Sequence, residues 1–294
     1  MIGFTLFLAV EKFLMLLPRR LRRAIFIGLG TLAYLLSKRY KKVVRDNLKF
    51  VYGENVDEAF VVRTTKYSFK LLLLNFLHTM ESRTYSVDEI AKKVTFENEE
   101  VVRKAQKEKR PIIIVTGHYG AWELAGSMVS AKLEPLMIVY KHMKNRYFEE
   151  YLLSSRAKWR MTYVERHGAT RAMITQLRSG KGMAILIDTN VNKKEAVSVD
   201  FLNHPTSQIK TTAYLARKFN AALIPALIHT KDDENYVIRF GEEIVPPKTD
   251  DEAHDILVST QMQTKWLSDE ILKEPEPWFW LHRRFKQDYP EIYD

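Results

Sequence analysis

From residue 112 onward the chain alternates short apolar runs with longer amphipathic segments, and this alternation constrains its fold more than any other feature. The runs have the length and the β-branched content of buried strands. They cover residues 112–115, 136–140, 162–164, 182–187 and 222–229, with 236–240 as a further strand at an edge. Strands that alternate with helices indicate a mostly parallel sheet with helices on both faces. We therefore expect an α/β fold.

Helical periodicity marks the segments between and around these runs. The expected helices cover residues 56–82, 87–92, 121–132, 146–159, 170–179, 207–219 and 253–272. No internal repeat and no low-complexity linker interrupts this part of the chain. We therefore expect one α/β domain over residues 51–294, preceded by a separate helical segment over residues 1–50.

The first 45 residues carry nine of the ten net positive charges of the chain, because they hold ten basic side chains and only one acid, Glu11. Two apolar stretches lie among these bases, over residues 2–17 and 24–36, and each is shorter than the roughly 20 residues that span a bilayer. The pattern favours helices inserted into a membrane interface, or one short tilted anchor, with the cluster at 19–23 facing cytoplasmic headgroups. The alternative is a buried helical hairpin with a solvated basic turn. The bases follow the first apolar run and no A-x-A site appears, so we expect no signal cleavage.

Several classes of function are disfavoured by what the sequence lacks. With no cysteine, the chain has no disulfide, thiolate metal site or Cys nucleophile. No Walker A or G-x-G-x-x-G motif points to a nucleotide cofactor, and no recognised motif or aromatic platform points to nucleic acid. No paired spacing of metal ligands appears, so we expect no metal. The histidines outside the site proposed below are therefore interpreted as structural: His78, His142, His167, His204, His229, His254 and His282.

The candidate site lies just after the run at 112–115, where open α/β sheets bind ligands. His118 stands there, between Gly117 and Gly120, and Glu123 follows in the first turn of the next expected helix. The glycines let the chain fold back, so that the histidine and the carboxylate can meet. A carboxylate on one imidazole nitrogen makes the other nitrogen an oriented general base. With no Ser or Cys at this turn, we expect direct deprotonation of a substrate hydroxyl, although a structural histidine is an alternative.

The block from Gly117 to Gly126 resembles the H-x4-D/E block of lysophospholipid-acyltransferase-like enzymes, and more narrowly that of the bacterial lipid A late acyltransferases, which often reads HxGNWE. Further blocks of that family have counterparts in the same order over nearly the whole chain. They are Arg45-Asp46-Asn47-Leu48, Val139-Tyr140-Lys141 with Asn145 and Arg156, Leu186-Ile187-Asp188, residues 201–205, 212–217 and 224–225, and the closing stretch 276–286.

This resemblance implies a glycerolipid-acyltransferase-like fold and an O-acyltransferase of lipid A, and so of lipopolysaccharide, biosynthesis. Such an enzyme transfers a fatty acyl chain from acyl carrier protein to a hydroxyl of a Kdo-bearing lipid A precursor, usually on a 3-hydroxyacyl chain. His118 would remove the hydroxyl proton, and Glu123 would orient the imidazole of His118. The acyl chain would arrive on the phosphopantetheine of acyl carrier protein, with no further cofactor. The implied location is the bacterial inner membrane, with the catalytic domain on the cytoplasmic face.

The resemblance also assigns functional roles to Arg156 and Asp188. Asp188 ends an expected strand on the same sheet edge as His118, and Arg156 could pair with it or bind a phosphate. The alternatives are a solvated helix face for Arg156 and a turn residue for Asp188. Arg166 and Lys210 are basic candidates for lipid phosphates or the phosphopantetheine arm. The aromatic and basic stretch 278–286 suits a membrane belt, a lid, or, as we favour, a segment docked on the core.

The chain departs from the family's pattern at Ala121, Thr189, Leu202 and Asn203, where the family usually has Asn, Gln, Phe and Gly, and these positions bear on acceptor and acyl-chain preference. Three other functions stay open. The acceptor could be a lysophospholipid or another glycolipid, such as a phosphatidylinositol mannoside or an ornithine lipid. The base could activate water, as in a thioesterase. The protein could also bind lipid at the membrane without catalysis.

Overall fold

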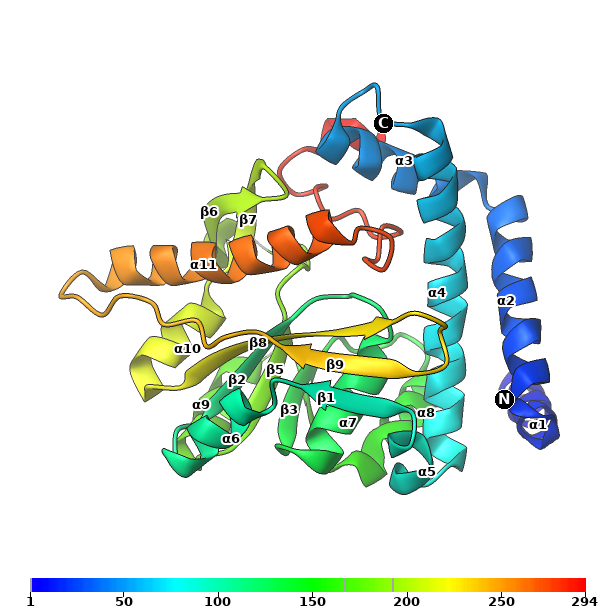
Figure 1. Ribbon diagram of the computed structural model, residues 1–294, viewed down its shortest axis with the longest axis horizontal. Coiled ribbons are helices and arrows are strands. Elements are labelled where there is room, and N and C mark those ends of the chain that lie inside the picture. Colours follow the sequence, from blue (N-terminus) through cyan, green and yellow to red (C-terminus); the bar gives the residue numbers. More distant parts are fainter. Residues whose placement is uncertain (1, 167, 192) are drawn as a thin grey trace.

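A computed structural model describes residues 2–166, 168–191 and 193–294; His167, interpreted above as structural, lies outside them. Within these residues a seven-stranded sheet forms the centre, in the order β1-β9-β8-β2-β5-β3-β4 (Figure 1). The strands are β1 (Val94–Glu97), β2 (Ile112–Thr116), β3 (Leu136–Tyr140), β4 (Thr162–Glu165), β5 (Gly182–Leu186), β8 (Ala222–Thr230) and β9 (Tyr236–Phe240). The five strands from β8 to β4 are mutually parallel. The predicted α/β class with a mostly parallel sheet is therefore confirmed.

The strand β9 was predicted to lie at an edge of the sheet, and this prediction is wrong. β1 pairs with β9 in parallel on one side, and β9 runs antiparallel to β8 on the other. Two further elements, β1 and the helix after it, α6 (Glu100–Lys107), were not predicted from the sequence. Both are short, and the exposed Thr95 and Glu97 give β1 a half-polar pattern.

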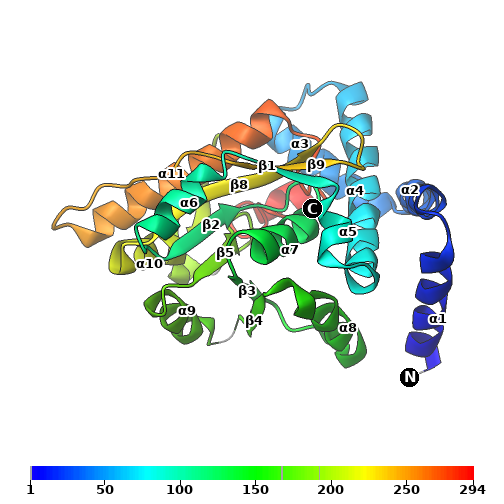
Figure 2. The same cartoon turned by 60° about the horizontal axis from the view of Figure 1, so that its bottom comes forward.

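Side chains of the central strand β2 alternate between two hydrophobic cores. Ile112 and Ile114 face the core beneath α6 and α7 (Trp122–Lys132), whereas Ile113 and Val115 face the core beneath α9 (Ala169–Arg178), α10 (Thr211–Phe219) and α11 (Glu252–Lys273). The alternation follows from the two-residue period of a strand. Helices therefore cover both faces, as Figures 1 and 2 show. The remaining short helices are α5 (Val87–Ala91), α8 (Arg146–Arg156) and the 3-10 turns Ala157–Trp159, Lys193–Glu195 and Pro290–Tyr293.

A separate two-stranded ribbon, β6 (Ala196–Phe201) and β7 (His204–Ile209), stands beside α11. Leu202 and Asn203 form its turn with φ values of 51° and 67°, a left-handed conformation that is uncommon for leucine. The helix predicted over 207–219 is therefore wrong at its start: residues up to Ile209 belong to β7, and α10 begins at Thr211.

Three helices begin the chain, α1 (Ile2–Leu16), α2 (Arg19–Leu36) and α3 (Lys38–Tyr52), followed by the long α4 (Glu58–Thr84). Figure 1 places α2 along α4, and these two helices share extensive contacts. Val44 and Leu48 of α3 are buried in the same core as Ile113. The division of the chain at residue 50 stays a prediction.

The helices α1 and α2 expose an apolar surface. Its members are leucines, a valine and a phenylalanine: Leu6, Val10, Phe13, Leu16, Leu21, Leu29, Leu32, Leu35 and Leu36. Leu16 and Leu36 are the most open, at 79% and 74% of their full accessibility. Within the described part of the chain, no helix combines the length and the hydropathy needed to cross a bilayer.

Candidate active site

The loop between β2 and α7 folds sharply over the carboxyl edge of the sheet. Gly120 has a φ of 57°, and a Cβ atom there would lie 2.3 Å from the carbonyl oxygen of Ile228, so only glycine fits. The Gly120 carbonyl accepts a hydrogen bond from the Asn75 side chain of α4, and its N–H donates to the Pro277 carbonyl. These contacts from remote segments fix the position of His118.

His118 is bound to Asp188, not to Glu123 as the sequence had suggested. The Asp188 carboxylate lies 2.9 Å from Nδ1 of the His118 ring and 2.7 Å from the His118 backbone nitrogen. Strand register explains why His118 and Asp188 lie together. Thr116 of β2 pairs with Leu186 of β5, and His118 and Asp188 each lie two positions further along their chain segments. The predicted placement of His118 and Asp188 on one sheet edge is confirmed.

The pKa values of the pair are set by burial and by each other. Burial raises the pKa of Asp188, which is 2% exposed, but the charge of His118, two hydrogen bonds from His118 and one from the indole of Trp278 hold that pKa at about 2. Burial lowers the pKa of His118, yet Asp188 and then Glu123 bring it above its usual value. An ionised Asp188 only accepts hydrogen bonds, so Nδ1 of neutral His118 donates and its Nε2 is left with the lone pair.

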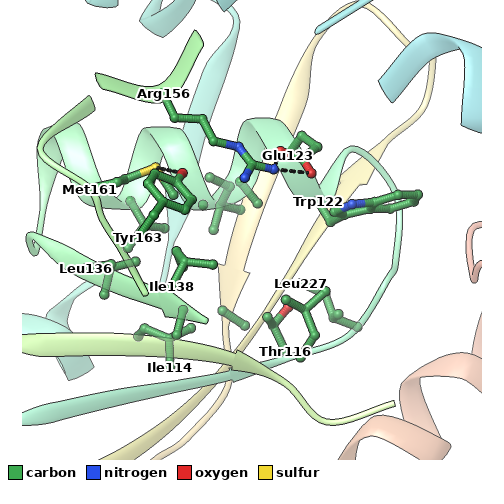
Figure 3. Close-up of a pocket in the computed structure, with 17 residues that line it drawn as sticks. Ile114, Thr116, Trp122, Glu123, Leu136, Ile138, Arg156, Met161, Tyr163 and Leu227 are labelled. Carbon is green, nitrogen blue, oxygen red and sulfur yellow. Dashed lines mark hydrogen bonds and ion pairs between the residues drawn. The ribbon is translucent and has the colours of Figure 1, made fainter. Parts of the chain in front are cut away.

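Glu123 is instead bound to Arg156 of α8, whose Nη2 lies 2.7 and 2.6 Å from the two carboxylate oxygens. The guanidinium also stacks over the ring of Tyr163, 4.8 Å from its centre (Figure 3). The predicted alternatives for Arg156, a bond to Asp188 or a solvated helix face, are therefore both wrong, because its side chain is only 11% exposed and its carboxylate partner is Glu123.

A pocket of about 630 Å³ opens beside this ion pair, between α7 and the strands β2, β5 and β3. Figure 3 shows Ile114, Leu136 and Ile138 on the strand side, with Glu123 and Arg156 above them. The lining is almost entirely apolar apart from that ion pair. Thr116 and Trp122, on either side of His118 in the sequence, also line it, so the pocket reaches the His118 loop.

The C-terminal stretch is docked on the core, as favoured from the sequence. Trp278, Trp280 and Phe285 are almost completely buried, and the N–H of Phe279 donates to the His118 carbonyl. The rings of Trp122 and Phe279 contact the His118 ring, at 5.4 and 6.1 Å between centres, and contact each other at 5.3 Å. The direct role of Trp278 on Asp188 was missed, because its signal, an aromatic residue near the end of the chain, does not specify a partner.

Two of the predicted basic residues lie away from this cluster. Arg166 is exposed in the bend after β4, and Lys210 is half-buried immediately before α10. Neither belongs to the described residues that line the pocket. The described residues also contain no group of three or more His, Asp or Glu side chains arranged to hold a metal.

Comparisons with known proteins identify the family. The family model described as "Bacterial lipid A biosynthesis acyltransferase" matches residues 1–287. The chain is 26% identical to the lipid A biosynthesis lauroyltransferase of Escherichia coli over 88% of this chain and 83% of that one. It is 22% identical to the palmitoleoyltransferase of the same organism, over 89% and 84%. A lipid A biosynthesis acyltransferase of Haemophilus influenzae is 25% identical over 99% and 94%.

Among solved structures, the 1-acyl-sn-glycerophosphate acyltransferase of Thermotoga maritima is similar with a TM-score of 0.42 and 14% identity, covering 87% of this chain and 98% of that one. Because the family model spans nearly the whole sequence, the assignment does not rest on that structure. The chain belongs to the bacterial lipid A biosynthesis acyltransferase family.

Proposed function

We propose that this acyltransferase moves a fatty acyl chain from acyl carrier protein to a hydroxyl of a Kdo-bearing lipid A precursor, with His118 as the general base. The observation that carries the proposal is the Asp188–His118 pair, which lies in a loop whose flanking residues Thr116 and Trp122 line an apolar pocket. An oriented imidazole whose Nε2 carries the lone pair suits the removal of a hydroxyl proton, and an apolar pocket suits an acyl chain.

In the proposed reaction, Nε2 of His118 takes the proton of the acceptor hydroxyl. The oxygen attacks the thioester carbonyl, the C–S bond breaks, and the departing thiolate receives the proton from the imidazolium. Asp188 stabilises that imidazolium, in keeping with the raised pKa of His118. General-base assistance of this kind contributes about 10²–10⁴-fold, and alignment of the two substrates contributes further.

Glu123 keeps a role in this proposal, but an indirect one. Its negative charge favours the imidazolium of His118 through space, and its bond to Arg156 holds a guanidinium at the pocket mouth. A fixed guanidinium there is suited to the oxyanion that forms at the thioester carbonyl. Arg166 and Lys210 are proposed only as outer contacts for phosphates of the acceptor or the carrier.

We propose that the chain acts at the cytoplasmic face of the bacterial inner membrane, held there by α1 and α2. The support is the apolar surface of these two helices beside a strongly basic segment. Leucines of this kind bury in the acyl boundary, while exposed basic side chains remain with anionic headgroups. The predicted exposure of the whole cluster at 19–23 is wrong, because Arg22 is buried against Glu81 and Arg23 is bound to Glu234. A basic surface also speeds encounter with an acidic carrier protein.

The test uses purified full-length protein with acyl carrier protein thioester and a Kdo-bearing tetraacyl lipid A precursor, read by mass spectrometry. We expect the precursor to gain the mass of one acyl chain, and His118→Ala to abolish that gain. Release of free fatty acid without acceptor acylation would identify a thioesterase. Transfer to a lysophospholipid in preference to the precursor would identify another acceptor. Full activity of His118→Ala would overturn the mechanism.

A further inference from the structure

A second cavity, of about 590 Å³, lies where α2 meets α4, α5 and β9. We call it the basic cavity. Its charged lining comes from five residues, the cations Arg19, Arg22 and Lys93 and the carboxylates Glu81 and Glu89. Hydroxyl and imidazole groups complete the polar wall, supplied by Ser82, Tyr85, Tyr236 and His78. None of these residues belongs to the candidate active site.

The inner end of the basic cavity carries more positive than negative charge. Nη2 of Arg22 lies 3.1 Å from one oxygen of Glu81, and Nε of Arg19 lies 3.7 Å from the same oxygen. His78 approaches the other carboxylate oxygen at 3.8 Å. Two guanidinium groups therefore share a single buried carboxylate, and Lys93 adds a third cation to the lining. The Glu89 carboxylate accepts hydrogen bonds from the backbone N–H and the hydroxyl of Ser86, so it is not paired with the cations of the cavity.

Arg22 is built into this wall and is incompletely satisfied. Its side chain is 2% exposed and donates to the carbonyls of Met15 and Leu17, to Glu81 and to the Tyr85 hydroxyl. Its Nε is buried and has no hydrogen-bond partner among the residues that the structure describes. Leaving a charged donor buried and unpaired is costly, so such a group points to a missing acceptor.

We propose that the basic cavity binds a phosphate group, carried by the headgroup of a membrane lipid. Phosphate oxygens form short, charge-assisted hydrogen bonds with Arg and Lys, and the hydroxyls offer further donors. The lipid source follows from position. Arg22 holds the turn between α1 and α2 by its carbonyls, and that turn exposes Leu16 and Leu21, so the cavity lies directly behind the surface proposed to enter the membrane.

The helix α4 connects the basic cavity with the His118 loop. Asn75 of α4 binds the Gly120 carbonyl, and Glu81 follows six positions later, roughly 9 Å along the axis. We infer that a lipid whose phosphate lies in the basic cavity could present another part of itself toward His118, because α4 places the two within about 9 Å along its axis. This last link rests on the proposed function, whereas binding of the phosphate does not.

The experiment measures binding to the full-length protein in detergent micelles. The probes are dihexanoyl phosphatidic acid, dihexanoyl phosphatidylcholine and inorganic phosphate, titrated at matched ionic strength. Protein labelled with ¹⁵N-arginine reports on Nε–H of Arg22, so this buried residue need not be mutated. We expect saturable binding of phosphatidic acid with a shift of the Arg22 Nε–H signal, and weaker binding of the other two probes.

The variants Arg19→Gln and Lys93→Gln are expected to weaken phosphatidic acid binding about tenfold each, as for the loss of one charge-assisted contact. The matched control is Arg20→Gln, which removes the same charge from the next, exposed position on α2 and should change binding less than twofold. Thermal unfolding verifies that each variant is folded.

Equal losses in Arg19→Gln and Arg20→Gln, or an unmoved Arg22 signal, would overturn the site. Inorganic phosphate that binds as tightly as phosphatidic acid would overturn the lipid source. The His118→Ala variant should bind phosphatidic acid normally, so a failure of acyl transfer and a failure of this site are distinguishable.

Discussion

Two ion pairs lie close to the start of α7, and they hold their carboxylates in different surroundings. Asp188 is 2% exposed and receives three hydrogen bonds, two from His118 and one from Trp278. The Glu123 side chain is 29% exposed and is held by one guanidinium at the pocket. The first arrangement sets the pKa of His118, whereas the second fixes a charge beside the apolar pocket. The comparison teaches that the nearest carboxylate in the sequence is not the one that orients the histidine.

The largest effect is expected for His118→Ala. It removes the proposed base from the first pair and should lower acyl transfer about 10²–10⁴-fold. The measurement is the initial rate of precursor acylation by mass spectrometry. His254→Ala is the matched control, since His254 is exposed on α11 and should leave the rate unchanged. A residual rate within a factor of three of the unmodified protein would remove His118 from the mechanism.

Asp188→Asn should lower the rate about 10²-fold, because the amide neither stabilises the imidazolium nor secures the same tautomer. Asp188 raises the pKa of His118, so its loss lowers that pKa. Since the neutral imidazole is the active form, the acidic limb of the kcat/KM profile should move to lower pH. The profile is measured from pH 5 to 9. An unmoved limb would mean that another group sets it.

Substitutions in the second pair, Glu123–Arg156, should move the acidic limb of the kcat/KM profile in opposite directions. Arg156→Gln leaves the charge of Glu123 uncompensated, which raises the pKa of His118 and moves the limb to higher pH. Glu123→Gln removes a charge that raises that pKa, so the limb moves to lower pH. The double variant should lie between them. We expect rates about tenfold below normal for each single variant, with the pH shifts smaller than that of Asp188→Asn.

The smallest effect is expected for Trp278→Phe, which removes one hydrogen bond from Asp188 and should lower the free energy of unfolding by about 1 kcal/mol at neutral pH. The bond helps hold the pKa of Asp188 at about 2, below its unfolded value of about 4. Its stabilisation is therefore present above pH 4 and disappears as the pH falls towards 2.

The matched control is Trp280→Phe, which loses a hydrogen bond to the neutral carbonyl of Pro275. Denaturant unfolding at several pH values should find a pH-dependent difference for Trp278→Phe alone. The same pH dependence of the unfolding free energy in both variants would show that the hydrogen bond to Asp188 is not its cause.

The central sheet could be predicted because its strands are buried on both faces and read as continuous apolar runs, as in Ile112 to Val115. The ribbon of β6 and β7 could not, since Ala196–Phe201 mixes polar and apolar residues and its turn uses Leu202 in place of glycine. The short β1 could not be predicted for a similar reason, because two of its four residues are exposed.

The site was half predictable. His118 could be predicted as a site residue from its place after β2. Its partner could not, because it depends on which strand lies beside β2, and local sequence does not specify the order of strands in a sheet. Once β5 is known to pair with β2, the register alone aligns Asp188 with His118. The bond between Glu123 and Arg156 depends on how α8 packs, which periodicity does not report.

The segment that carries Pro277, Trp278 and Phe279 contacts the His118 loop through the backbone and the Asp188 carboxylate through an indole. During synthesis on the ribosome this segment emerges long after β2 and β5 have been made. A nascent chain that already contains the histidine and its aspartate still lacks the pieces that hold them. The support of His118 and Asp188 is therefore completed only after the segment that contains Trp278 and Phe279 has been made.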